Sequence, residues 1–248
     1  MRGGVDEIEQ PTLRQGSPSP VRGGVGVGVS RGDRKKRAAI TRSRLRTFRR
    51  NLLDWYAANG RDLPWRRTRD PYAIVVSEIM LHQTQVSRVI PFYERFLRKY
   101  PTVEALARAR RRDVKRLTDP LGYKIRGRWL HAIAQHVAEE RAGYFPQTVD
   151  ELRRLPGVGR YTAGAVMSFA FHRDAPILDT NVARLLSRYF GAQRSRSELW
   201  ALASRVIPPG KAYVFNQALM DLGALVCVSR APRCVACPLR RGCRMLHA

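Results

Sequence analysis

The sequence predicts an all-α protein, on three observations. Apolar residues recur at helical spacing along the chain from residue 43 to residue 226, as in Leu130, Ile133, Ala134 and Val137. Glycine- and proline-rich breaks separate these segments. The apolar–polar alternation typical of strands is absent beyond the first forty residues. The breaks are too irregularly spaced for a solenoid of repeats.

The expected helices follow one another without a long interruption. They lie in the segments 48–56, 74–86, 90–97, 103–107, 130–137, 149–155, 163–170, 182–189, 199–206 and 215–226. Thr102 is a suitable N-cap for the fourth of these, with Glu104 in its first turn. Asp179 could cap the helix that follows it in the same way.

The charge of the chain points to an anionic partner. Lys and Arg number 46 against 20 Asp and Glu, which gives a formal net charge of +26 over 248 residues. Nucleic acid is the commonest polyanion, and surface arginines spread over the helices, Arg126 and Arg128 among them, would attach the protein to it. No run of about 18 apolar residues predicts a membrane span, and no secretory signal is recognisable. These features predict a cytoplasmic protein associated with the nucleoid.

The first forty residues differ in composition from the rest. They contain Gly-Val alternation, Ser-Pro repeats and a basic cluster at residues 34–37, without helical periodicity. Such a segment has too little apolar mass to fold, so it predicts a disordered basic tail over residues 1–40.

Four cysteines lie within the last 22 residues, at Cys227, Cys234, Cys237 and Cys243. The spacing C-x6-C-x2-C-x5-C in a chain without a secretory signal favours metal ligation over disulfides. Four thiolates suit a structural zinc ion or a [4Fe–4S] cluster, and the spacing alone leaves both open.

A glycine-rich turn separates two apolar helical segments at residues 155–162, with the sequence LPGVGRYT. Two glycines permit a tight turn with exposed backbone N–H groups, and the next helix adds its N-terminal dipole. This arrangement predicts a helix–hairpin–helix site for a nucleic-acid phosphate. The residues expected to form it are Gly157, Val158, Gly159, Arg160 and Thr162.

Several motifs in consistent order resemble the endonuclease III superfamily of helix–hairpin–helix DNA glycosylases. They cover roughly residues 46–244. The motifs are LPWR (63–66), DPY (70–72), SEIMLHQTQV (77–86), LGYKIRGRWLH (121–131), LPGVGRYTAGAV (155–166), ILDTNVARLLSR (177–188), FNQALMDLGALVC (215–227) and the cysteine loop. Within the superfamily they are similar to the MutY adenine glycosylases and to the Mig thymine-mismatch glycosylases.

The resemblance implies a fold of two helical domains with the active-site cleft between them. A six-helix barrel with the helix–hairpin–helix would span residues 63–173. Residues 41–62 together with 174–248 would form the second domain, where the four cysteines hold one [4Fe–4S] cluster. The resemblance also implies a monomer acting on double-stranded DNA that contains a mismatch or lesion.

The chemistry of such an enzyme needs two acidic groups. Breaking an N-glycosidic bond in a flipped nucleotide leaves a sugar cation, so a carboxylate must lie nearby, and an acid must protonate the departing base. Glu78 interrupts an apolar helical stretch, where burial would raise its pKa. The resemblance gives Glu78 the role of general acid, and it gives Asp179 the role of stabilising the sugar cation.

Tyr161 stands where bifunctional members of the superfamily carry a lysine. A lysine amine forms a Schiff base with the sugar and allows strand cleavage, which a phenol cannot do. We therefore expect a monofunctional glycosylase with little or no lyase activity.

The resemblance implies further roles near the base. Gln83 and Tyr123 would be wedges that fill the gap left by the flipped nucleotide. Trp65, Arg66 and Leu81 would line the base pocket, and Asn181 would orient water. His82 departs from the glutamine of MutY enzymes at this position, which bears on recognition of the opposite base.

The target base has two candidates. The motifs SEIMLHQTQV and FNQALMDLG favour adenine opposite guanine or 8-oxoguanine. The chain ends five residues after Cys243, without the C-terminal domain with which MutY enzymes read 8-oxoguanine, and this ending and the RYFG stretch favour thymine or uracil opposite guanine. A third, remote alternative is a non-catalytic iron–sulfur DNA-binding protein, against which Glu78 and Asp179 both argue.

Overall fold

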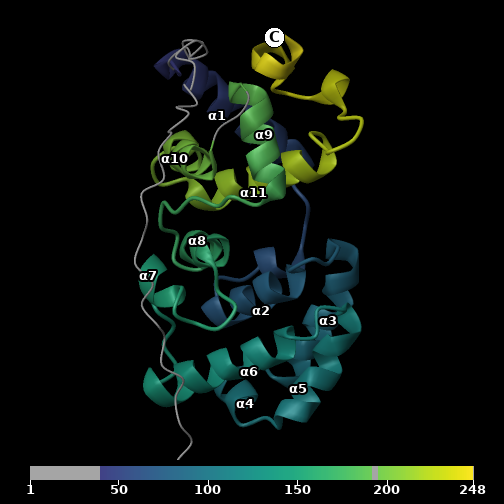
Figure 1. The fold of residues 1–248 in the computed structure, drawn as a ribbon, viewed down its shortest axis with the longest axis vertical. Coiled ribbons are helices and arrows are strands. Elements are labelled where there is room, and N and C mark those ends of the chain that lie inside the picture. The colour runs from purple at the N-terminus through teal and green to yellow at the C-terminus, as the bar shows by residue number, and fades with distance from the viewer. Residues whose placement is uncertain (1–39, 192–194, 248) are drawn as a thin grey trace, which may run out of the picture. The chain divides into compact units, whose positions relative to one another are not determined.

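The described residues of the computed structural model, 40–191 and 195–247, form helices and turns, with no strand among them (Figure 1). The expected all-α class is therefore confirmed. The basic tail expected for residues 1–40 lies outside the described residues, apart from Ile40. The helices are α1 (Arg42–Asn59), α2 (Pro71–Leu81), α3 (Val86–Lys99), α4 (Val103–Ala107), α5 (Arg111–Thr118), α6 (Arg126–Gln135), α7 (Val149–Leu152), α8 (Arg160–Phe169), α9 (Thr180–Phe190), α10 (Arg196–Val206) and α11 (Ala212–Leu225). A π-helical segment, His136–Glu140, continues α6.

Helix α2 is buried along almost its whole length. Asp70 caps it by accepting a hydrogen bond from the Tyr72 N–H, and Pro71 occupies the first turn, where no N–H is needed. Every residue from Tyr72 to Met80 is buried, because α3, α6 and α8 all pack against this helix. A helix that is apolar on all sides belongs in the interior of a protein, which explains this placement.

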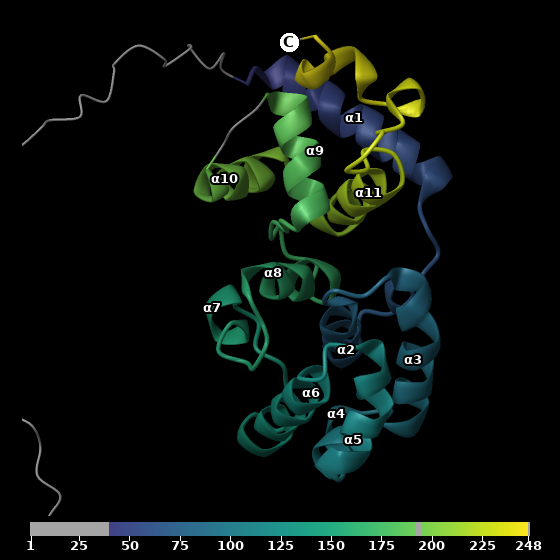
Figure 2. The same cartoon turned by 45° about the vertical axis from the view of Figure 1, so that its right-hand side comes forward.

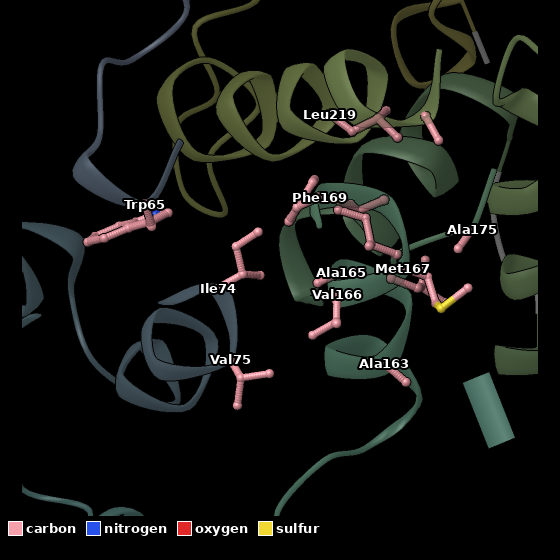
Figure 3. Packing of buried hydrophobic residues seen from close by; sticks show 14 of the residues in the cluster. Trp65, Ile74, Val75, Ala163, Ala165, Val166, Met167, Phe169, Ala175 and Leu219 are labelled. Carbon is pink, nitrogen blue, oxygen red and sulfur yellow. The ribbon is translucent and has the colours of Figure 1, made fainter. Parts of the chain in front are cut away.

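Helices α2 and α8 pack closely through small side chains. Figure 3 shows Ile74 and Val75 of α2 facing Ala165 and Val166 of α8. On another side of α8, a Cβ atom added at Gly164 would lie 2.2 Å from the carbonyl oxygen of Pro176. Gly164 therefore lets the chain that leads to α9 run directly against α8.

Helices α1, α9, α10 and α11 pack around a second part of the core (Figure 2). Phe48 of α1 lies at its centre, with its ring centroid 4.7 Å from that of Tyr189, 5.0 Å from Phe190 and 6.1 Å from Phe215. Helix α8 also contacts α11, so the two parts of the core are continuous.

The expected helix caps at Thr102 and Asp179 are confirmed. The Thr102 hydroxyl accepts a hydrogen bond from the Ala105 N–H, and the Asp179 carboxylate accepts one from Val182. Among the described residues, no helix is long and apolar enough to cross a membrane.

Arg126 corrects one expectation from the sequence. Instead of presenting its charge at the surface, its side chain is fully buried, because the C-terminal end of α2 supplies hydrogen-bond acceptors for the guanidinium. Arg128, two residues further along α6, is exposed as expected.

Candidate active site

A pocket of about 500 Å³ collects most of the residues that the sequence singled out. Its walls come from the segment before α2, from α2 and the turn after it, from α8, from the start of α9, and from α10 and α11. Eight of the nine expected catalytic, pocket and wedge residues line it: Trp65, Arg66, Glu78, Leu81, Gln83, Tyr161, Asp179 and Asn181.

Glu78 projects from the buried helix α2 into this pocket. Its side chain is 3% exposed, and its Oε2 atom has no hydrogen-bond partner. Burial raises the pKa of Glu78 to about 7, and the charge of Asp179 adds to this, while a hydrogen bond from Tyr161 and the charge of Arg66 oppose it. Near neutral pH, Glu78 can therefore both hold and release a proton.

Asp179 is held by two hydrogen bonds at the start of α9. Its Oδ1 atom accepts from the Val182 N–H at 2.7 Å, and its Oδ2 atom accepts from the Asn181 side-chain amide at 2.9 Å. Asn181 in turn accepts a hydrogen bond from Arg184 at 2.8 Å. These two hydrogen bonds fix the position of the Asp179 carboxylate in the pocket that it lines.

Tyr161 lies in the first turn of α8, opposite Glu78. Burial raises the pKa of its phenol well above the usual value, and the charges of Glu78 and Asp179 raise it further. The hydroxyl therefore stays protonated, and it donates a hydrogen bond to the Sδ atom of Met220 at 3.9 Å.

Arg66 is bound by an aspartate that the sequence did not indicate. Asp221 of α11 is fully buried and forms ion pairs with Arg66 at 2.8 Å and with Arg61 at 2.6 Å. Although burial acts in the opposite direction, the hydrogen bonds from Arg66 and Arg61 hold the pKa of Asp221 below its usual value. The network fixes the guanidinium of Arg66 as one wall of the pocket, and the Trp65 ring packs edge-on against Tyr93.

The turn after α2 forms the rim of the pocket. Leu81, His82, Gln83 and Thr84 all line it, and Gln83 adopts a positive φ of 54°. The His82 ring lies edge-on to Trp129 and 3.4 Å from the Thr162 hydroxyl. Burial, together with the charge of Arg126, lowers the pKa of His82, so the ring is neutral at physiological pH.

Tyr123 lies outside the pocket, unlike the other expected wedge. Its side chain is exposed and packs edge-on against Trp129, the ring that also contacts His82. Tyr123 and Gln83 thus belong to two neighbouring loops and not to one.

The glycine-rich turn joins α7 to α8. Gly157 has a φ of 75°, and a Cβ atom there would meet the Trp129 ring at 2.4 Å, so this position requires glycine. The side chains of Val158 and Thr162 are buried, which leaves only their backbone to face a ligand. No side chain caps α8, and its first N–H groups therefore lack the partner that Asp179 provides for α9.

Arg160 begins α8, and its side chain is exposed. Its guanidinium lies 4.2 Å from the centre of the Trp200 ring of α10. A guanidinium placed over an aromatic face in this way can still donate hydrogen bonds to a ligand through its N–H groups.

The four cysteines lie in the loop that follows α11, and all of them are partly exposed. Burial raises the pKa of Cys237 to about 11, and each of the other three thiols contributes by its charge, so the four lie within electrostatic range of one another. Arg188 of α9 reaches the Sγ atom of Cys227 at 3.6 Å. Within the described part of the chain, no three His, Cys, Asp or Glu side chains are arranged around a single metal-ion position.

Several pocket residues were not expected from the sequence. Among them are Arg61, Thr84, Arg196, Gln217, Met220 and Ala224. Met220 and Gln217 lie in the motif FNQALMDLG, so the motif marked their helix without indicating which side chains face the pocket.

Residues 76–209 match the HhH-GPD superfamily of base excision DNA repair proteins. The match covers more than half of the chain, which therefore belongs to this superfamily, as the motifs predicted. The chain is similar to the adenine DNA glycosylase of Rattus norvegicus, with 46% identity over 212 residues, 79% of this chain. It is also similar to the thymine-DNA glycosylase of Aeropyrum pernix, with 37% identity over 214 residues that cover 82% of this chain and 96% of that protein.

Solved structures agree with this assignment. A thermostable thymine-DNA glycosylase superimposes with a TM-score of 0.80 at 32% identity, over 84% of this chain and 99% of that one. Endonuclease III from a trapped DNA complex shares the fold, with a TM-score of 0.74 at 24% identity over 84% of this chain and 98% of that one. The chain spans 41% of the rat adenine DNA glycosylase.

The burial of Glu78 predicts a pH-dependent contribution to stability. Its folded pKa lies above the usual value, so the folded state binds the proton more tightly, and stability falls as the pH rises from about 4.5 through 7. The shift of the pKa from 4.5 to about 7 corresponds to about 3 kcal/mol at pH 8. The stability of Glu78→Gln relative to that of the unmodified protein should therefore rise from pH 5 to pH 8, as measured by urea unfolding.

Glu139→Gln is the matched control, because Glu139 is exposed and this substitution also converts a glutamate to an amide. Its stability should follow that of the unmodified protein at both pH values. If the stability of Glu78→Gln changed with pH in the same way as that of the unmodified protein, burial would not raise the pKa of Glu78.

Proposed function

We propose that the protein is a DNA glycosylase that hydrolyses the N-glycosidic bond of a mispaired base. One observation carries the proposal: Glu78, with a pKa of about 7, and the firmly held carboxylate of Asp179 line a single pocket large enough for a base. One acid to protonate a leaving base and one fixed negative charge beside a sugar cation are the groups that this hydrolysis needs.

The residues would act in the following way. Glu78 in its protonated form donates its proton to a ring nitrogen of the flipped base, which lets the base depart as a neutral molecule. The ionised Asp179 stabilises the positive charge that develops on the sugar. Glu78, now ionised, accepts a proton from the attacking water, and Asn181 helps to orient that water.

Adenine opposite guanine or 8-oxoguanine is the favoured target. The support is the identity of 46% to the rat protein that carries the name adenine DNA glycosylase, together with the motifs SEIMLHQTQV and FNQALMDLG. Thymine or uracil opposite guanine is the second candidate. Its support is the structural likeness to the thermostable thymine-DNA glycosylase, over nearly the whole of that chain.

Double-stranded DNA would be bound by phosphate contacts and by wedging. The uncapped first turn of α8, from Gly159 onward, offers backbone N–H groups to one phosphate, and the stacked guanidinium of Arg160 lies beside them. The net charge of +26 would add salt-dependent attraction along the duplex. Gln83 and Tyr123 would fill the space left by the flipped nucleotide. The protein would act as a monomer at the DNA of the nucleoid.

The four cysteines are proposed to hold one [4Fe–4S] cluster. Four thiols in one loop, within electrostatic range of one another and next to the Arg188 guanidinium, fit a negatively charged thiolate cluster. When bound, the cluster would crosslink the loop internally, beginning at Cys227 just after the end of α11, as a structural element. The helices packed around α11, with this loop, would then correspond to the domain expected for residues 41–62 and 174–248, and α2–α8 to the barrel of residues 63–173.

A panel of duplexes containing A·8-oxoG, A·G, T·G and U·G pairs tests the proposed reaction. Base release, scored as alkali-labile abasic sites, should occur from the A·8-oxoG and A·G duplexes. Glu78→Gln and Asp179→Asn should each slow single-turnover release by at least 10²-fold while duplex binding is retained, because each removes a group that acts in the reaction.

Glu139→Gln is again the matched control and should release the base at the unmodified rate. If release occurred only from the T·G and U·G duplexes, the target would be thymine or uracil opposite guanine and not adenine. Undiminished release by both acidic-site variants would refute the mechanism, and no release from any duplex would favour a non-catalytic DNA-binding protein.

Tyr161→Lys tests the assignment of a monofunctional enzyme. The lysine amine at this position can attack the sugar carbon as the base leaves, and the resulting Schiff base allows the strand to break by elimination. The variant should therefore nick a substrate strand without alkali, which a denaturing gel detects, and borohydride should trap it on the DNA. Tyr161→Phe is the control and should release the base without nicking. Equal nicking by the unmodified protein would contradict the assignment.

Iron content tests the proposed cluster. Protein purified without oxygen should contain about four iron atoms per chain and a broad visible absorbance band, and Cys237→Ser should reduce both and lower the melting temperature. Arg241→Gln, in the same loop, is the control and should retain the iron. One zinc ion per chain in place of iron would contradict the cluster.

A further inference from the structure

Arg126 is the largest fully buried side chain of the described residues, and its charge is not matched by a carboxylate. None of the ion pairs in the described part of the chain includes it, and its Nη1 atom has no hydrogen-bond partner. A buried cation is costly unless polar groups compensate it, so its surroundings must explain why it is there.

The compensation comes from the end of α2. The Nε atom of Arg126 donates to the Ile79 carbonyl at 3.1 Å, and the Nη2 atom donates to the His82 carbonyl and to the Thr84 hydroxyl. These acceptors are at the C-terminal end of a helix, where the backbone dipole favours a positive charge. One guanidinium thus binds both sides of the turn that contains Gln83.

The conformation of Gln83 depends on such support. Its φ of 54° is uncommon for a residue with a side chain, and such a conformation persists only where neighbouring contacts impose it. Arg126 binds the residues on each side of Gln83, His82 and Thr84, so it supplies that constraint. Thr84 also donates to the Leu121 carbonyl at 3.4 Å, next to the loop of Tyr123.

The same guanidinium contacts the second expected wedge. It lies 5.6 Å from the centre of the Tyr123 ring, and the backbone N–H of Arg126 donates to the Tyr123 carbonyl at 3.2 Å. Arg126 therefore contacts both the loop of Gln83 and the loop of Tyr123. It does not line the pocket that contains Glu78 and Asp179.

We propose that Arg126 is a positioning residue that fixes Gln83 and Tyr123 relative to each other, so that it is required for extruding a base from paired DNA and not for breaking the glycosidic bond. The inference rests on the proposed function. It separates two steps: the wedges act while the duplex opens, and the acidic pocket acts after the base has entered it.

Arg126→Lys and Arg126→Met test the proposal on two substrates. One is a duplex with the target base opposite guanine. The other carries the same base opposite a tetrahydrofuran abasic analogue, so that no base pair has to be broken. Arg126→Met should slow single-turnover release from the paired duplex by about 10- to 100-fold, as expected for misplaced contact residues, and slow release from the unpaired duplex by less than about 3-fold. Arg126→Lys keeps the charge and some hydrogen-bond donors. Its rate of release from the paired duplex should lie between those of the unmodified protein and Arg126→Met.

Two controls isolate the positioning role. Arg128→Met removes an exposed positive charge from the same helix and should change both rates by the same factor. Leu52→Ala, a buried change in α1, which packs against α11, lowers stability away from α2 and α6 and should leave the ratio of the two rates unchanged. Urea unfolding of each variant measures how much stability has been lost.

A measurement without catalysis distinguishes this inference from the proposed function. In the Asp179→Asn background, 2-aminopurine next to the mispaired base should brighten on binding as the neighbouring base leaves the stack. Adding Arg126→Met should abolish the increase at saturating protein. Unchanged brightening, or an equal loss of rate on both substrates, would overturn the positioning role. Brightening without base release by the unmodified protein would instead refute the proposed reaction.

Discussion

The close packing of α2 against α8 is the constraint on which the pocket depends. Small side chains and Gly164 let α2, α8 and the segment leading to α9 come together, and each contributes one acidic or phenolic group. A bulkier contact would separate Glu78 from Tyr161. The same packing removes water from around α2, and this burial raises the pKa of Glu78. The geometry of the site and its acidity therefore have one origin.

The local features of this fold could be read from the sequence. The caps at Thr102 and Asp179 and the glycine at position 157 are properties of short segments, and the structure agrees with them. Helical periodicity was a weaker guide, because the helix expected over 74–86 ends at Leu81 and the helix α5 (Arg111–Thr118) was not expected. Glu78 was recognisable because a carboxylate in an apolar helix is unusual. Its expected burial follows from its immediate neighbours alone.

Contacts between distant segments could not be read in this way. Asp221 lies 155 residues from Arg66, and nothing in the spacing of charges connects them. The burial of Arg126 was missed because its acceptors are carbonyl groups at the end of another helix, which no residue type reveals. Val158 and Thr162 were expected beside DNA, but whether their side chains face inward depends on how the turn packs.

Several arginines of this protein bind backbone carbonyl groups at helix ends, a structural role that the net charge alone does not indicate. Arg49 donates to the carbonyls of Val206 and Ile207 at the end of α10, and Arg184 donates to the carbonyls of Gly223 and Cys227 at the end of α11. A guanidinium can satisfy several terminal carbonyls at once, which a lysine does less well. Part of the excess of +26 is therefore committed to joining helix ends and does not face outward.

The stack of Arg160 on Trp200 has a consequence for the rate and the strength of encounters. A free arginine side chain has about 2 kcal/mol of rotamer entropy, much of which is lost when it grips a ligand. Here the aromatic ring has already restricted the side chain in the unbound protein. When a phosphate binds at the start of α8, the Arg160 side chain therefore loses little further conformational entropy, and binding is opposed less.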